Sequence, residues 1–322
     1  MSFSNVFNEN KLFFSKGQSY NQPMFPPNST WDQYATTFAN QTQIGTQPYD
    51  LYIDMNNSIY TINLQNGRIL IWMNNSNDPN LILYAQLSSS AFSIFVTTNG
   101  QIYVGDNPLI KSNSYSNQTI EIVNVSSSSI YGLFVDLNNT LYCSLFGKHK
   151  VVKKSLNSNS STMTTVAGTD SAGSASNLLN CPFGIFVDTN FDLYVVDTAN
   201  NRIQLFRLGQ INGITVAGST SANPTISLNQ PKNVILDGNK YLFITDDNHR
   251  IIGSDENGFR CIVACSMSSG STSDKLFYPR SIAFDSFGNL FVADTSNIRI
   301  QKFCLSTNFC NNKKKERFDM FI

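Results

Sequence analysis

The chain has 322 residues with 22 basic and 22 acidic side chains, and 41% of its residues are hydrophobic. This content indicates a globular protein, and the balanced charge disfavours non-specific nucleic-acid binding, which needs a basic surface. No apolar run reaches the roughly 20 residues of a membrane span, and residues 8–11 interrupt the apolar N-terminal residues where a signal peptide needs an apolar stretch. We therefore expect a soluble chain. An extracellular location would require an N-terminal segment absent from this sequence.

Six similar stretches follow one another along the chain, each rich in β-branched and aromatic residues. They occupy residues 48–63, 93–106, 132–145, 182–197, 231–246 and 279–294. Their aligned anchor positions are Asp54, Thr97, Asp136, Asp188, Asp237 and Asp285. The intervals between anchors are 43, 39, 52, 49 and 48 residues. A period in this range is typical of a repeat protein with one supersecondary unit per copy.

The copy over 182–218 shows the content of one unit most clearly. It holds four short alternating segments: GIFVD at 184–188, LYVVD at 193–197, RIQLF at 202–206 and ITVAG at 214–218. Asn, Asp and Gly separate them, as expected of turns between strands. Four strands per unit in six units, without helical periodicity, predict an all-β, six-bladed β-propeller of four-stranded antiparallel blades.

The two ends of the repeat region predict how the propeller closes. The last unit stops after its third strand, IRIQKFCL at 298–305, whereas WDQYATTFANQ at 31–41 precedes the first unit. We therefore expect residues 31–40 to supply the outer strand of the last blade. The propeller would then span 31–305, between an N-terminal extension, 1–30, and a C-terminal tail, 306–322.

The most regular copies resemble a known repeat. The stretch PFGIFVD, then YVVDTANNRIQLF, then TVAG is similar to the NHL repeat, and VADTSNIRIQKF at 292–303 repeats the central signature. The resemblance implies a six-bladed propeller. It also implies three kinds of role, since such propellers include protein-binding and RNA-binding modules and related metal-dependent enzymes, among them lactonases and a peptide-amidating lyase.

Acidic and basic residues recur at both ends of the turn between the second and third segments. The pairs are Asp197 and Arg202, Asp246 and Arg250, and Asp294 and Arg299, and the other units have Arg68, Lys111 and Lys150 at the basic position. These side chains could form a cationic surface for acidic partners, or ion pairs that fix each blade. We favour the ion pairs, because a residue type that recurs in every unit is expected to stabilise the fold of that unit.

The anchor aspartates and the two histidines also have structural interpretations. Each anchor precedes a turn, where an Asp side chain accepts backbone hydrogen bonds. His149 and His249 both directly precede the basic position. Zinc or copper chemistry draws on several imidazoles, so two scaffold histidines disfavour an amidating lyase.

Carboxylates for a calcium-dependent enzyme are also scarce. The four glutamates are Glu9, Glu121, Glu256 and Glu316. None precedes a predicted innermost strand, whereas Asp50 and Asn233 do, which leaves a weak cation site open. Nucleophile-elbow, zincin and P-loop motifs are absent from the sequence. We therefore assign no catalytic residue, metal ligand or cofactor.

The six cysteines are expected to be buried free thiols. They are Cys143, Cys181, Cys261, Cys265, Cys304 and Cys310. Cys261 and Cys265 fall in one predicted strand, where four steps would place them about 13 Å apart, too far for a disulfide.

We expect a monomeric, non-catalytic binding or scaffold propeller that recognises a protein or peptide. The predicted contact regions are the loops that join one blade to the next, Thr169–Cys181, Ser219–Gln230 and Ser266–Tyr278, because they are polar and differ from one another. The alternatives are a metal-dependent hydrolase or lyase and an RNA-binding propeller. The basic run at 313–317 is interpreted as a solvated tail.

Overall fold

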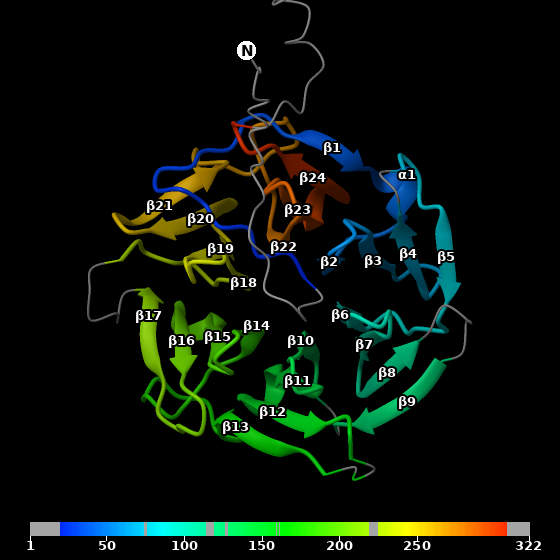
Figure 1. The fold of residues 1–322 in the computed structure, drawn as a ribbon, viewed down its shortest axis with the longest axis vertical. Coiled ribbons are helices and arrows are strands. Elements are labelled where there is room, and N and C mark those ends of the chain that lie inside the picture. The colour runs from blue at the N-terminus through cyan, green and yellow to red at the C-terminus, as the bar shows by residue number, and fades with distance from the viewer. Residues whose placement is uncertain are drawn as a thin grey trace, which may run out of the picture.

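The computed structural model describes residues 20–73, 76–113, 119–125, 128–158, 160, 162–218 and 225–307. Within these residues, 24 strands form six four-stranded antiparallel sheets. Figure 1 shows the sheets arranged as six blades around a central axis, with one strand of each blade innermost. The predicted fold class is therefore confirmed.

The blades are numbered in chain order, and each runs from its innermost to its outermost strand. Blades 1–3 comprise β2 (Leu51–Ile53), β3 (Ile59–Asn63), β4 (Arg68–Trp72) and β5 (Leu81–Tyr84), then β6 (Ala91–Val96), β7 (Ile102–Asp106), β8 (Leu109–Asn113) and β9 (Thr119–Asn124), then β10 (Ile130–Val135), β11 (Thr140–Leu145), β12 (Lys150–Ser155) and β13 (Thr164–Gly168). Blades 4–6 comprise β14 (Pro182–Val187), β15 (Leu193–Asp197), β16 (Arg202–Phe206) and β17 (Ile214–Gly218), then β18 (Asn233–Leu236), β19 (Leu242–Asp246), β20 (Arg250–Asp255) and β21 (Gly258–Val263), then β22 (Pro279–Phe284), β23 (Leu290–Asp294), β24 (Arg299–Phe303) and β1 (Thr36–Ala39).

The second strand of each blade is buried along almost all of its length. All five residues of β15 are buried, and the strand pairs with β14 on one side and β16 on the other. Its Val195 and Val196 are fully buried between neighbouring blades. Such strands read as nearly continuous apolar runs, since a propeller blade packs against another blade on each face.

The strand β1 closes the propeller by pairing with β24, as predicted. Thr36 lies opposite Lys302, and Ala39 lies opposite Ile300. Phe38 packs edge-on against Phe291 of its own blade and Trp72 of blade 1, with ring centroids 5.4 and 5.6 Å apart. The single-turn helix α1 (Gln41–Ile44) then leads the chain into blade 1. Blade 6 is thus built from both ends of the repeat region.

Residues 20–31 belong to none of the six blades. They pack across the face of the propeller on which the innermost strands end. Figure 1 shows this dark-blue segment passing from the centre of the propeller outward over blades 5 and 6. Asn21 donates hydrogen bonds to the carbonyls of Asp54 and Phe284, in blades 1 and 6. Phe25 is buried against Trp31, with ring centroids 4.9 Å apart. We call residues 20–31 the strap.

Two cysteine expectations are wrong. Cys261 and Cys265 form a disulfide with Cα atoms 5.7 Å apart. The strand β21 ends at Val263, and Ala264 then adopts a left-handed φ of 57°, so the chain turns back instead of extending. Cys304 is also disulfide-bonded.

The expectation of free thiols holds for Cys143, which is buried, and for Cys181, which is half-buried. Burial raises the pKa of the Cys143 thiol. Cys310, Glu9, Glu316 and residues 313–317 lie outside the described residues.

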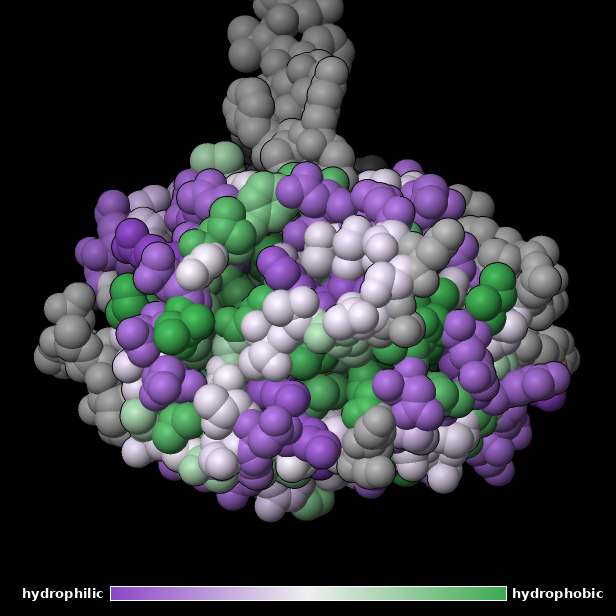
Figure 2. Space-filling view, turned by 90° about the horizontal axis from the view of Figure 1, so that it is seen from below, coloured by the Kyte–Doolittle hydropathy of each residue, from purple (hydrophilic) through white to green (hydrophobic). Residues whose placement is uncertain are grey.

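Within the described ranges, no helix is both long and apolar enough to cross a membrane. Figure 2 shows the molecule edge-on as a flattened disc, with hydrophobic and hydrophilic residues interspersed over the visible edge. A mixture of this kind is ordinary for a protein surface, so the edge gives no guide to a binding site.

Candidate functional site

The Asp and Arg residues of the repeat signature form buried ion pairs at the turn between the second and third strands. Nε of Arg202 lies 2.7 Å from Oδ2 of Asp197, and the equivalent pair in blade 6, Arg299 and Asp294, is separated by 2.6 Å. In blade 5 an Arg250 Nη atom lies 3.2 Å from Asp246. All three carboxylates are fully buried. The arrangement leaves no free cationic surface at these positions.

The same arginines hold the loop that leads into their own blade. The Nη atoms of Arg202 donate hydrogen bonds to the carbonyls of Ser174, Ala175 and Leu178, at 2.8–3.1 Å. Since a guanidinium offers five donors, one side chain can bind both its Asp and a neighbouring loop. The loop 169–181 is therefore fixed by the repeat signature itself.

The expectation that the blade-connecting loops differ from one another is wrong for two of them. In the loop 266–278, the guanidinium of Arg299 donates to carbonyls at the equivalent positions, namely those of Ser271, Thr272 and Lys275. Asn200 donates to the carbonyl of Gly173, and Asn297 does the same to Gly270. These loops belong to the repeating scaffold. Of the loop 219–230, the structure describes residues 225–230.

Other blades use different partners at the basic position. Lys111 of blade 2 lies 2.6 Å from Asp106, so this blade also has an internal ion pair. Lys150 of blade 3 lies 2.9 Å from Asp170, which lies in the loop 169–181. In blade 1 the side chain of Asn63 caps the turn, accepting from two backbone N–H groups.

The five anchor aspartates each cap the turn that follows an innermost strand. Oδ1 of Asp188 accepts backbone hydrogen bonds from Asn190 and Asp192, at 2.8 and 3.0 Å. The same two bonds, from residues two and four positions later, occur at Asp54, Asp136, Asp237 and Asp285. Each carboxylate serves its own turn, and in the described part of the chain no cluster of three His, Cys, Asp or Glu could hold a metal ion.

The two histidines connect neighbouring blades. Nδ1 of His149 accepts a hydrogen bond from the backbone N–H of Cys181, and Nδ1 of His249 accepts one from Tyr278. In blade 4, Asn201 occupies the equivalent position and its side chain accepts from Gln230. All three acceptors have left-handed backbones, with φ of 50–62°. The histidines therefore lie in repeated structural contacts.

A different set of residues gathers around the other opening of the central channel, where the innermost strands begin. Each blade contributes one side chain from the same repeat position, and we call this set the collar. Its members are Tyr49, Phe92, Tyr131, Phe183, Lys232 and Arg280. Unlike the anchors, the collar positions change along the chain, from four aromatic residues in blades 1–4 to two basic residues in blades 5 and 6.

Three of the four aromatic residues of the collar form a stack. Tyr131 lies between Phe92 and Phe183, with centroids 5.0 and 4.2 Å away and interplanar angles of 11 and 16°. Gly132 permits this approach, because a Cβ at that position would lie 2.6 Å from the carbonyl oxygen of Phe183. Burial raises the pKa of Tyr131, and the charge of Arg280 acts in the opposite direction.

The two cations of the collar differ in how they are compensated. Lys232 is buried, and its Nζ lies 2.9 Å from a carboxylate oxygen of Asp247. Burial lowers the pKa of Lys232, although Asp247 opposes the shift. The guanidinium of Arg280 lies over the rings of Tyr49 and Phe183, at 4.6 and 5.6 Å from their centroids. Its Nε is buried and has no hydrogen-bond partner among the described residues.

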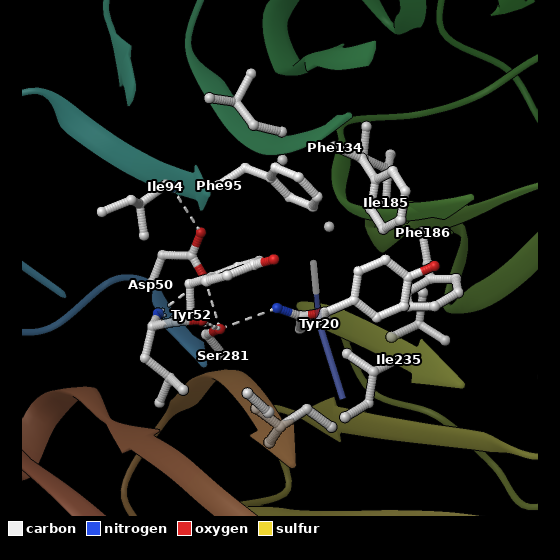
Figure 3. Close-up of a pocket in the computed structure, with 18 of the residues that line it drawn as sticks. Tyr20, Asp50, Tyr52, Ile94, Phe95, Phe134, Ile185, Phe186, Ile235 and Ser281 are labelled. Atoms are coloured by element: carbon white, nitrogen blue, oxygen red, sulfur yellow. Dashed lines mark hydrogen bonds between the residues drawn. The ribbon is translucent and has the colours of Figure 1, made fainter. Parts of the chain in front are cut away.

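A chamber lies beneath the collar, lined by the innermost strands of all six blades. The wall is apolar, and Figure 3 shows Phe95, Phe134 and Phe186 gathered around it. At the end opposite the collar, the ring of Tyr20 packs edge-on against Phe134 and Phe186, with centroids 5.3 Å away in each case. The strap thus gives the chamber a floor, and Tyr131 of the collar contributes to its upper rim.

The rim of the chamber holds a hydrogen-bonded chain across four blades. Asp50 accepts from Ser281 Oγ at 2.6 Å and from the backbone N–H of Leu51 and Ile94, at 2.9 Å each (Figure 3). Asn233 donates to the same Ser281 hydroxyl at 3.1 Å. Burial raises the pKa of Asp50 to about 7, and these hydrogen bonds oppose the shift. Asp50 and Asn233 are thus brought to one site, through a serine that the sequence did not single out.

The two glutamates of the described residues take no part in this site. Glu121 and Glu256 are exposed on the surface. A calcium site at the chamber would therefore have to rest on Asp50 and neutral oxygen ligands, a poor set for a hard cation that prefers six to eight oxygens.

The collar could have been found from the sequence by aligning the repeats and asking where they disagree. The residue before Asp50 and its counterparts varies from aromatic to basic, whereas the position before it stays apolar. The chamber floor gave no such signal, because residues 20–31 contain no copy of the repeat.

No family model matches the sequence, and no curated protein matches it. Membership of the NHL family therefore remains a prediction. Similar solved structures include a protein of unknown function from Bacteroides thetaiotaomicron, 14% identical over 84% of this chain and 75% of that one, with a TM-score of 0.65. A virginiamycin B lyase from Staphylococcus aureus is 13% identical over 84% and 99%, with a TM-score of 0.58. An auxiliary nutrient-binding protein from Bacteroides thetaiotaomicron is 14% identical over 89% and 75%, with a TM-score of 0.61. At these identities the likeness shows the propeller fold, which hosts both enzymes and binding proteins.

Proposed function

We propose that the chain is a non-catalytic binding protein that recognises a protein or peptide at the collar. The observation that carries the proposal is the contrast between repeat positions. The ion pairs, turn caps and two blade-connecting loops recur from blade to blade, so they serve the scaffold. The collar position instead gathers one side chain per blade at a single place and changes its chemistry from aromatic to basic.

The residue types of the collar support recognition of a polypeptide. Aromatic and Arg side chains are enriched among the residues that dominate protein-binding energy, because they offer large rigid surfaces and directed donors. The collar is also pre-organised, since Phe92, Tyr131 and Phe183 are already stacked in the unbound structure. Binding to such a surface costs little side-chain entropy.

A matched pair of variants tests the proposal. The collar variant carries Phe92→Ser and Arg280→Gln, and the control carries Phe287→Ser and Arg207→Gln, which change exposed residues near the opposite face. Proteins captured by the immobilised chain are identified by mass spectrometry. We expect a partner that the parent chain and the control retain and that the collar variant loses, with circular dichroism unchanged in both. A partner retained equally by both variants contradicts the proposal.

An enzymatic role is the second candidate, and the rim of the chamber is the observation that favours it. Asp50, with a pKa of about 7 and a hydrogen bond from Ser281, has the properties of a general acid or base near neutral pH. Incubation with ester, lactone and lyase substrates would detect such an activity. Turnover that disappears in Asp50→Asn would favour the enzyme over the binding protein.

The remaining alternatives receive less support. A metal-dependent hydrolase or lyase would need ligands that the described residues do not gather into one place. An RNA-binding propeller would need several unpaired cations to neutralise phosphates, whereas Lys232 is already paired with Asp247.

A further inference from the structure

The guanidinium of Arg280 lies over two aromatic rings of the collar. Its central carbon is 4.6 Å from the ring centroid of Tyr49 and 5.6 Å from that of Phe183, so cation–π contacts attract it to both rings. These rings place the guanidinium but offer no oxygen acceptor for its N–H groups. The donors of a guanidinium lie along its edge, in the plane.

No acceptor for that edge is present among the described residues. Nε of Arg280 is buried without a partner, and the side chain forms no hydrogen bond or ion pair within the described part of the chain. The arginines of the repeat signature behave differently, since Arg202 and Arg299 each bind a buried aspartate and several carbonyls. A partly buried cation without an acceptor costs free energy that a bound anion would recover.

The neighbouring charged groups are already engaged. Lys232 is paired with Asp247 at 2.9 Å. The carboxylate of Asp50 accepts three hydrogen bonds, from Leu51, Ile94 and Ser281, and is not in contact with Arg280. Of the two cations of the collar, Arg280 is therefore the one whose charge has no carboxylate partner and whose N–H donors no described residue accepts. A monoanion with two oxygens in one plane matches it, because the fork of a guanidinium binds carboxylates through two parallel N–H donors.

We propose that Arg280 is the anchor of a carboxylate-binding site at the channel mouth, which takes a carboxylate of the peptide partner. The inference rests on the proposed binding function and specifies the chemistry of its ligand. Tyr49 and Phe183 position the guanidinium, and its edge binds the anion. The carboxylate comes from an acidic side chain or from a chain end, two sources with the same chemistry.

Short peptides distinguish these sources. Ligand-observed NMR titrations would use acetyl-Gly-Glu-Gly-amide, its Gln counterpart, acetyl-Gly-Gly-Gly with a free carboxylate, and inorganic phosphate. We expect the Glu peptide or the free-carboxylate peptide to bind in the millimolar range or tighter, and the Gln peptide to bind at least tenfold more weakly. Whichever of the two binds identifies the source of the carboxylate. Binding of phosphate in preference to both carboxylates overturns the inference.

Variants of the full chain then assign the binding to Arg280. Arg280→Gln should weaken the carboxylate probe at least tenfold, and Arg280→Lys should weaken it too, because Lys keeps the charge but loses the planar fork. Arg207→Gln, which removes an exposed charge elsewhere, should change nothing. Unchanged affinity in Arg280→Gln, or no binding of any probe to the parent chain, overturns the inference. If Arg280→Gln still captures the protein partner that the collar double variant loses, the proposed function stands and the carboxylate site falls.

Discussion

Arg202 and Asp197 form an ion pair with 2.7 Å between Nε and Oδ2, and the same arginine also holds the loop before its blade. Both side chains are buried, with 4% and 0% exposure. Burial raises the pKa of Asp197, while the hydrogen bonds from Asn200, Asn180 and Arg202 oppose the shift. Arg202 therefore stabilises two parts of the fold: the turn within its blade, through Asp197, and the loop that connects blades 3 and 4.

Replacing Arg202 with Met should destabilise the protein strongly. Arg202→Met removes the partner of a buried carboxylate and frees the loop 169–181, and a broken buried pair costs about 3–5 kcal/mol. Urea unfolding followed by circular dichroism would measure the loss. The exposed Arg207→Met is the control and should stay within about 0.5 kcal/mol of the parent. The double variant with Asp197→Asn should recover part of the loss, and failure to do so would refute the ion-pair explanation.

The strap should stabilise the propeller through Tyr20. Its ring contacts Phe134 and Phe186, so Tyr20→Ala removes an aromatic plug and should lower the free energy of unfolding by about 3 kcal/mol. Tyr34→Ala is a matched control, because that ring is 72% exposed. Chemical denaturation of the two variants would compare them. Equal effects would mean that the floor of the chamber contributes little to stability.

The rim carboxylate should make stability depend on pH. The folded-state pKa of Asp50 is about 7, whereas the ordinary value is 3.8, so the unfolded chain ionises first as the pH rises. The stabilisation from Asp50 is therefore complete below about pH 4. As the pH rises through 7, this stabilisation is lost and the free energy of unfolding falls by up to about 4 kcal/mol.

The variant Asp50→Asn isolates this effect, since its side chain does not titrate. Denaturation curves for both proteins at pH 5 and pH 8 should show the parent losing stability relative to the variant at the higher pH. A constant difference between the two proteins would mean that Asp50 titrates at its ordinary pKa.

The histidine contacts between blades should tolerate Asn but not Leu. Asn201 fills the equivalent position with the same acceptor geometry, so His249→Asn can still accept from the N–H of Tyr278. His249→Leu removes the acceptor and should cost about 1 kcal/mol. Thermal unfolding of both variants would decide. A loss in His249→Asn as large as in His249→Leu would show that the imidazole acts through packing.

The sequence predicted those features that the repeat itself encodes. The alternation of apolar residues predicted the strands, and the intervals between the anchor positions predicted the blades. The residues at 31–41 predicted the closure, which the pairing of Thr36 with Lys302 confirms. Features that depend on the chain leaving the repeat were missed. The disulfide of Cys265 depends on the left-handed Ala264, and the strap depends on tertiary contacts of residues without any periodic pattern.

The collar was missed for another reason. Its side chains are far apart in the sequence and belong to different types, so no local pattern joins Tyr49 to Arg280. The circular arrangement of the blades places Tyr49 of blade 1 beside Arg280 of blade 6. The hydrogen bond between Asp50 and Ser281 joins the same two blades.

The pairing of β1 with β24 has a consequence for how the chain is made. Blade 6 lacks its outer edge until the first strand of the propeller meets the last, so closure is among the most non-local events of folding. On the ribosome, β1 emerges early and must wait with an unpaired edge until β24 follows. During that interval the nascent chain exposes a strand edge that can pair with other chains.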